Sequence, residues 1–203
     1  VIYGYKANGL WHAGDSANFK QFIGSGFSAG NVRPVDINGD NKIDANHDQV
    51  IVGYTRPRWV VGMTNSFSYK NFEFSIFLYG RLNYLFNTGG EAQVARSSTR
   101  SINYYTENNT NAEYQKPIYS TGAGDLYSSS LGYQQASFIK IRNISASYNI
   151  TGKLLKSMTM SSLRAYIQVA NPGMLFSKIK FMDMDASSFT YNRGFTFGIN
   201  AAF

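Results

Sequence analysis

A short acidic loop gives the strongest signal for chemistry in this sequence. Side chains that bear oxygen recur at alternate positions from Asp36, and a further carboxylate follows at Asp48. Calcium takes roughly six to eight oxygen ligands, and a tight loop with this spacing points several of them at one centre. The spacing predicts a structural calcium site whose ligands are Asp36, Asn38, Asp40, Lys42 through its carbonyl, Asp44 directly or through water, and Asp48.

The same loop has a second interpretation. Asn41 stands where an EF-hand loop has glycine, and His47 stands where it has glutamate. An Asx-rich turn, in which side-chain oxygens cap the loop's own main chain, produces the same composition. In both interpretations the loop is a rigid element without a catalytic role.

Signals for catalysis are weak elsewhere. His12 and His47 are the only histidines and lie far apart in the sequence, and there is no cysteine to act as nucleophile or metal ligand. Neither a glycine-rich phosphate loop nor a serine nucleophile elbow occurs. The sequence therefore predicts that this protein is not an enzyme and has no catalytic or cofactor-binding residues.

The net charge of +7 comes from dispersed residues. Nucleic-acid binding needs Lys and Arg clustered on one element. The sequence offers only pairs such as Lys140 with Arg142 and Lys178 with Lys180, so we expect no nucleic-acid partner.

The elements that carry these residues are predicted to be long β-strands. In residues 189–203 the odd positions are apolar, with Arg193 as the exception, and the even positions are small or polar. A soluble strand has about 5–6 residues, whereas a strand of a membrane barrel needs about 9–11. Similar alternation predicts further strands at 59–69, 72–79, 136–150 and 161–171, and another within 1–12.

The composition and the connections favour a membrane barrel. Aromatic residues make up 16% of the chain and charged residues 15%, against about 25% charged in soluble domains. Long segments at 13–57, 86–135 and 172–188 alternate with short turns at 70–71 and 151–160, as extracellular loops and periplasmic turns alternate in outer-membrane barrels. The predicted fold class is thus all-β, an antiparallel transmembrane β-barrel.

The alternation also predicts a bulge and the positions that face lipid. In 138–150 the apolar phase slips after Ile141, which predicts a β-bulge near Arg142 and Asn143. The apolar positions are expected to face lipid: the odd positions of the last strand together with Trp59, Val61, Met63, Phe72, Phe74, Ile76 and Leu78.

Ordered motifs along most of the chain resemble the C-terminal part of SusC/RagA-type TonB-dependent transporters of Bacteroidetes-like bacteria. The acidic loop resembles that family's DxNGDGKID motif, and Tyr69–Ser75 resembles its YKNF hairpin. The other matching segments are Ile51–Pro57, Tyr105–Pro117, Ser137–Asn143 and the closing strand Gly194–Phe203. Residues 181–185 depart from the family, which has a DPE-like sequence there.

The resemblance implies a multi-pass barrel in the outer membrane that imports oligosaccharides or peptides with a SusD-like surface lipoprotein and the TonB complex. Residues 1–203 are then expected to be the C-terminal segment of the barrel, and the plug domain and the N-terminal barrel strands are expected to lie outside this chain. The sequence also leaves open a soluble, secreted β-sandwich that binds glycan and uses calcium as a structural staple.

Overall fold

The computed structural model describes residues 1–15, 27–88, 100–117, 127, 129–152, 155, 159–186 and 191–203. The chain divides into two compact units. One consists of Val1–Arg56 with Leu85–Gln134, and the other of Pro57–Tyr84 with Gln135–Phe203. Among the described residues, no helix is long and apolar enough to cross a membrane.

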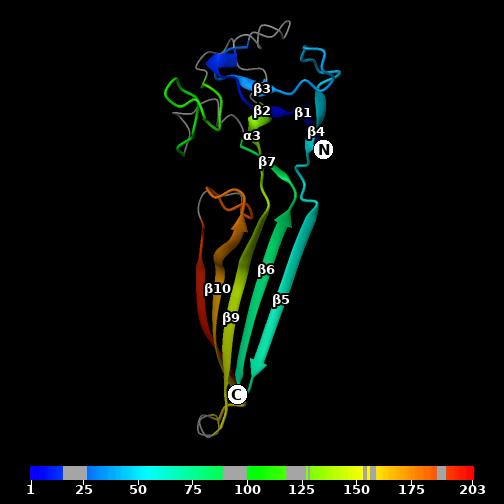
Figure 1. Ribbon diagram of the computed structural model, residues 1–203. Coiled ribbons are helices and arrows are strands. Elements are labelled where there is room, and N and C mark those ends of the chain that lie inside the picture. The colour runs from blue at the N-terminus through cyan, green and yellow to red at the C-terminus, as the bar shows by residue number, and fades with distance from the viewer. Residues whose placement is uncertain are drawn as a thin grey trace. The chain divides into compact units, whose positions relative to one another are not determined.

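The second unit is built on one antiparallel sheet (Figure 1). Its strand order is β11-β10-β9-β6-β5. The strands are β5 (Trp59–Tyr69), β6 (Phe72–Leu82), β9 (Phe138–Ile150), β10 (Ser162–Ser177) and β11 (Gly194–Ala202). The predicted all-β, antiparallel fold and these five strands are confirmed, and the Lys70-Asn71 turn joins β5 to β6 with Lys70 at φ 53°.

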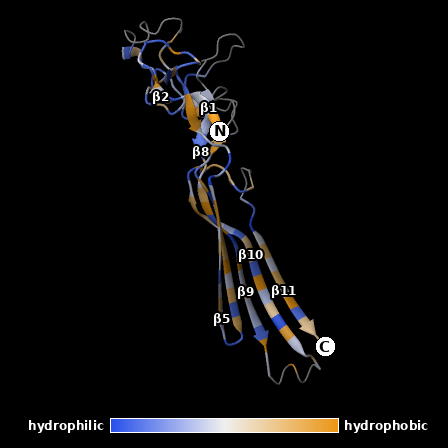
Figure 2. Cartoon of the chain, turned by 90° about the vertical axis from the view of Figure 1, so that its right-hand side faces the viewer, coloured by the Kyte–Doolittle hydropathy of each residue, from blue (hydrophilic) through white to orange (hydrophobic). Residues whose placement is uncertain are grey.

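The pairing register places most apolar residues of the five strands on one face of the sheet, although Phe77 and Tyr79 of β6 lie on the other face. Met63 pairs with Leu78, and Ile167 pairs with both Ala146 and Phe197. Directly paired residues of antiparallel strands point to the same side, so one apolar position lines up with the next across the sheet. Figure 2 shows the resulting alternation of hydrophobic and hydrophilic residues along the strands.

The predicted bulge in β9 is confirmed. Against β6, Asn143 pairs with Phe77 while Ile141 pairs with Leu78, which leaves Arg142 as the extra residue. Because an extra residue shifts the side-chain phase by one, it returns Ile141 to the apolar face and puts Arg142 on the polar face.

Strand β10 is longer than predicted. A loop was expected over 172–188, but the strand continues to Ser177, through Asn171-Pro172-Gly173, which has the composition of a turn. The register against β9 shifts between Ala170 and Gly173, so Pro172 lies in an irregularity. Proline is tolerated there because no ladder hydrogen bond from its nitrogen is required.

The first unit consists of short elements around a small core. Its strands are β1 (Ile2–Tyr5), β2 (Ala7–Leu10), β3 (Val32–Pro34), β4 (Gln49–Gly53), β7 (Leu85–Asn87) and β8 (Tyr133–Gln135), with helices η1 (Ala13–Asp15) and α3 (Ser129–Gly132). The two-stranded pairs are β1-β4, β2-β3 and β7-β8. The segments 13–57 and 86–135, expected to be long loops, therefore contain structure of their own. The core residues are Leu10, Val32, Ile43, Tyr105 and Tyr127.

Candidate functional site

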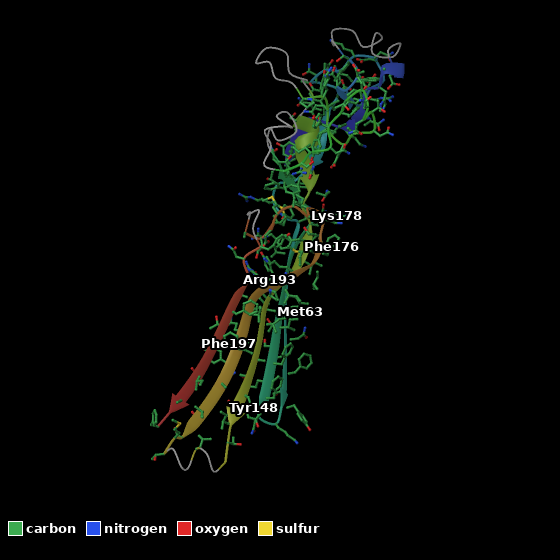
Figure 3. All side chains as sticks on the ribbon, turned by 90° about the vertical axis from the view of Figure 1, so that its left-hand side faces the viewer. Met63, Tyr148, Phe176, Lys178, Arg193 and Phe197 are labelled. Atoms are coloured by element: carbon green, nitrogen blue, oxygen red, sulfur yellow. The ribbon has the colours of Figure 1, made fainter. Side chains whose placement is uncertain are left out.

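The apolar face of the five-stranded sheet is exposed. Phe197 of β11 is 72% exposed and Met63 of β5 is 52% exposed, and Figure 3 labels both side chains on the two outer strands of the sheet. Apolar surface of this extent marks a site of contact with protein or membrane. The other large exposed residues of this face are Trp59, Val61, Phe67, Tyr69, Phe72, Tyr148, Ile167, Phe176, Phe195 and Ile199.

The opposite face of the sheet is polar and joined by hydrogen bonds. Arg164 of β10 donates to the carboxylate of Glu73 of β6 at 2.7 Å and to the Ser147 hydroxyl at 2.7 Å. The Asn149 amide also donates to Glu73. The pair of Arg164 and Glu73 is about half exposed, so this face is suited to contact with water.

A buried charge network lies on the same polar face where β9 begins. The ammonium group of Lys140 is 2.8 Å from Asp183 and 3.4 Å from Asp185. Lys140 and Asp183 side chains are 3% and 2% exposed. Arg142 binds Asp185 through two nitrogens at 2.9 and 3.1 Å and lies over the Tyr79 ring at 4.2 Å. Two cations of β9 thus reach one carboxylate, Asp185, while Lys140 also binds Asp183.

Both carboxylates belong to the 178–186 segment, which follows β10 and packs against the sheet. The side chains of Ile179, Met182 and Met184 are almost fully buried. The Tyr191 hydroxyl donates to the carbonyl of Met182 at 2.9 Å, and the main-chain N–H of Lys178 donates to the carbonyl of Ser137 at 3.0 Å. Apolar burial and charge pairing therefore act together to fix this segment.

The charge state of Asp183 follows from its contacts. Burial raises the pKa of its carboxyl group, but the hydrogen bond from Lys140 and those from the main-chain N–H groups of Asp185 and Ala186 outweigh burial. The pKa therefore lies below its usual value of 3.8, and Asp183 is charged at neutral pH.

The sequence did not reveal this network. In the sequence, Lys140 and Arg142 are one of several dispersed pairs of positive charges. Residues 181–185 stand out only because they depart from a family motif. Each carboxylate lies 43 residues from its cationic partner in the sequence. One usable signal was present, because charged residues in a strand with apolar neighbours need partners when they are buried.

The side-chain oxygens of the acidic loop accept hydrogen bonds from the loop's own main-chain N–H groups. Asp36 accepts hydrogen bonds from the N–H groups of Gly39 and Asn41 at 2.7 and 2.8 Å. Asp40 accepts from the N–H of Lys42 at 2.8 Å, and the Asn38 amide donates to Asp40. The φ of Asn41 is 61°, so asparagine takes the left-handed conformation that glycine has in an EF-hand loop.

Two further carboxylates of the predicted calcium site are also occupied. Asp48 is fully buried and accepts from the N–H groups of Ile37 and Asp44, each at 2.8 Å. Asp44 binds the main chain and ring of His47, and the hydrogen bond from that ring lowers the pKa of Asp44.

This geometry matches the Asx-turn interpretation of the loop. Among the described residues, no three His, Cys, Asp or Glu side chains gather in a way that could hold a metal ion. Calcium binding by Asp36, Asn38, Asp40, Lys42, Asp44 and Asp48 stays a prediction.

The first unit contains a cavity of about 700 Å³, within the usual range for small-molecule sites. Val50 and Val52 of β4 and Leu131 of α3 form an apolar part of its wall, and the aromatic lining residues are Tyr5, Tyr114 and Tyr133. Charged groups of opposite sign, Lys6 and Glu113, also line it. The cavity therefore suits a ligand that combines apolar, polar and charged parts.

Comparisons with known proteins relate the chain to TonB-dependent receptors. No family model matches the sequence. Over 176 residues, 84% of this chain, it is 24% identical to TonB-dependent receptor P3 of Formosa agariphila. Over 161 residues, 76% of the chain, it is 34% identical to TonB-dependent receptor SusC of Bacteroides thetaiotaomicron. These alignments span only 17% and 15% of the two receptors.

The fold is also similar to that of solved structures. A chain of the RagAB peptide transporter matches all of this chain with a TM-score of 0.68 at 15% identity, and the match spans 22% of the solved chain. The RagAB peptide importer in its open-open state matches with a TM-score of 0.66 at 14% identity. The chain therefore shares its fold with a part of these proteins.

Proposed function

Because this chain resembles SusC/RagA-type TonB-dependent transporters in sequence and fold, we propose that it is part of a barrel that imports nutrients across an outer membrane. The five-stranded sheet forms a section of the barrel wall. Its apolar face contacts lipid, and its polar face lines the interior. The exposed apolar face is the observation that carries this proposal.

Strand length and alternation support the membrane assignment. β5 and β6 each have 11 residues, β9 has 13 and β11 has 9. A barrel strand needs about 9–11 residues to cross the hydrocarbon layer. Side chains alternate between lipid and interior along such a strand, which requires the continuous apolar face that the register produces.

The two outer strands of the sheet support continuation into a larger barrel. Within the described residues, β5 and β11 each pair with one neighbour only. An unpaired edge inside a membrane leaves main-chain N–H and C=O groups without hydrogen-bond partners, at a cost of several kcal/mol each. In the proposed transporter, further strands of the complete protein pair with both edges.

The substrate and partners follow from the resemblance. We expect import of an oligosaccharide or a peptide, capture with a SusD-like lipoprotein, and energy from the TonB complex. The cavity beside Lys6 and Glu113 is the place in the first unit where a substrate with polar and apolar groups fits. This function requires no catalytic residues.

The alternative, a soluble glycan-binding β-sandwich, requires a second sheet. In a sandwich, two sheets bury their apolar faces against each other about 10 Å apart. The described strands of the second unit all belong to one sheet, and the apolar face of that sheet is exposed. The observations therefore favour the membrane protein.

Cell fractionation tests the proposal. An antibody against this chain is used on unboiled and boiled gels of membrane and soluble fractions. The expected result is a band in the membrane fraction that shifts on boiling and is several times larger than the 22.7 kDa of this chain. A 22.7 kDa species in the soluble fraction would overturn the transporter and favour the sandwich.

A further inference from the structure

We propose that Lys140 is a lock residue that holds the 178–186 segment closed over the polar face of the sheet. The segment is then a fixed part of the wall along the import path, an interpretation that rests on the proposed function. The contacts of Lys140 with the segment lie within the second unit. Their role can therefore be tested without a transport assay.

The position of Lys140 gives it this role. Its ammonium group lies within 3.4 Å of both carboxylates of the segment and is more deeply buried than the Arg142 side chain, which is 41% exposed. Ion pairs that exclude water are screened far less by salt than exposed pairs. Lys140 is therefore the cation on which closure depends most.

Asp183 depends on this closure. The residue is 1% exposed, and its carboxylate accepts hydrogen bonds from Lys140 and from the main-chain N–H of Asp185. Removal of the ammonium group leaves a buried negative charge without its main partner, and such a charge moves to water when the chain can open. Opening the segment also exposes Met182 and Met184, which are otherwise covered.

A third cation, Arg81, reaches the network at longer range and serves as a comparison. Arg81 lies 3.8 Å from Asp185, and its side chain is 34% exposed. Because this pair is long and partly solvated, it contributes little to closure. A variant at Arg81 is therefore the matched control for a variant at Lys140.

Thiol labelling measures whether the segment is open. The chain has no cysteine, so Met182→Cys introduces one thiol into this part of the protein. The full-length protein with this substitution is purified in detergent, and its reaction with a water-soluble maleimide is timed. In the Lys140→Met background we expect labelling at least tenfold faster than with Lys140 present. In the Arg81→Gln background we expect a change below twofold.

Two controls accompany the labelling, and the heat-modifiable band reports whether the fold is kept. A thiol at the exposed Thr110 should react equally fast in all backgrounds, which shows that the reaction with the reagent itself is unchanged. The exchanged pair Lys140→Asp with Asp183→Lys should return Met182→Cys to slow labelling. Equal labelling rates with and without Lys140, in protein that keeps its heat-modifiable band, would overturn the lock and leave the transporter proposal standing.

Discussion

The substitution Phe197→Arg tests the assignment of the apolar face to lipid. Phe197 lies in the middle of β11, pairs with Ile167 and is 72% exposed. Arginine on the lipid side costs about 2–4 kcal/mol near the middle of the bilayer. Since about 1.4 kcal/mol corresponds to a factor of ten, the folding equilibrium in a membrane should fall by about 30-fold to about 700-fold.

The neighbouring residue provides the control. Thr196 pairs with Gln168 on the polar face, so Thr196→Arg places the same charge one residue away in the barrel interior. Urea titration of the heat-modifiable band in liposomes measures both variants. We expect a large loss for Phe197→Arg and a loss below about 0.5 kcal/mol for Thr196→Arg. Equal losses in the two variants, or none in Phe197→Arg, would refute the assignment of faces.

Three further predictions concern the packing at Gly198, the acidic loop and the pH dependence of the 178–186 segment. A Cβ atom at Gly198 would overlap the ring of Tyr166, so Gly198→Ala should lower the free energy of unfolding by about 1–3 kcal/mol, measured by thermal denaturation. Gly62→Ala is the control, because a Cβ atom there lies 3.5 Å from the Phe77 ring and should have little effect. Asp48→Ala removes two charge-assisted hydrogen bonds and should cost about 3–6 kcal/mol. A calcium chelator decides between the two interpretations of the acidic loop: it lowers the melting temperature of the wild type if the loop binds calcium, and leaves it unchanged if the loop is an Asx-rich turn alone. The lowered pKa of Asp183 stabilises the fold at pH values above 3.8 and stops doing so as the pH falls through the folded-state value. Because the thiolate is the reacting form, the labelling rate of Met182→Cys is divided at each pH by that of a thiol at the exposed Thr110. This ratio should stay constant from pH 6 to 8 and rise only at acidic pH.

The strands could be predicted because their signal is local. Alternation of apolar and polar residues identifies a strand from its own sequence, and the slip after Ile141 located the bulge. Strand β10 was predicted too short because Pro172-Gly173 has the composition of a turn, and only the pairing with β9 carries the strand through it.

The candidate site could not be predicted in the same way. Lys140 and Asp183 are distant in the sequence, and their pairing depends on the path of the chain after Ser177. The acidic loop could be located from its sequence, but its role could not, because its spacing suits both calcium ligation and capping of the main chain. The hydrogen bonds of Asp36, Asp40 and Asp48 match capping of the main chain, and calcium ligation stays a prediction.

The most direct test of the membrane assignment is a spin-label scan of β11 in liposomes. Single cysteines are placed at each of the nine positions from Gly194 to Ala202 and labelled with a nitroxide. Accessibility to oxygen, which concentrates in lipid, is compared with accessibility to a water-soluble nickel chelate. The account predicts a period of two, with the odd positions such as Phe195, Phe197 and Ile199 accessible to oxygen and the even positions to nickel. High nickel accessibility along the whole strand would contradict it.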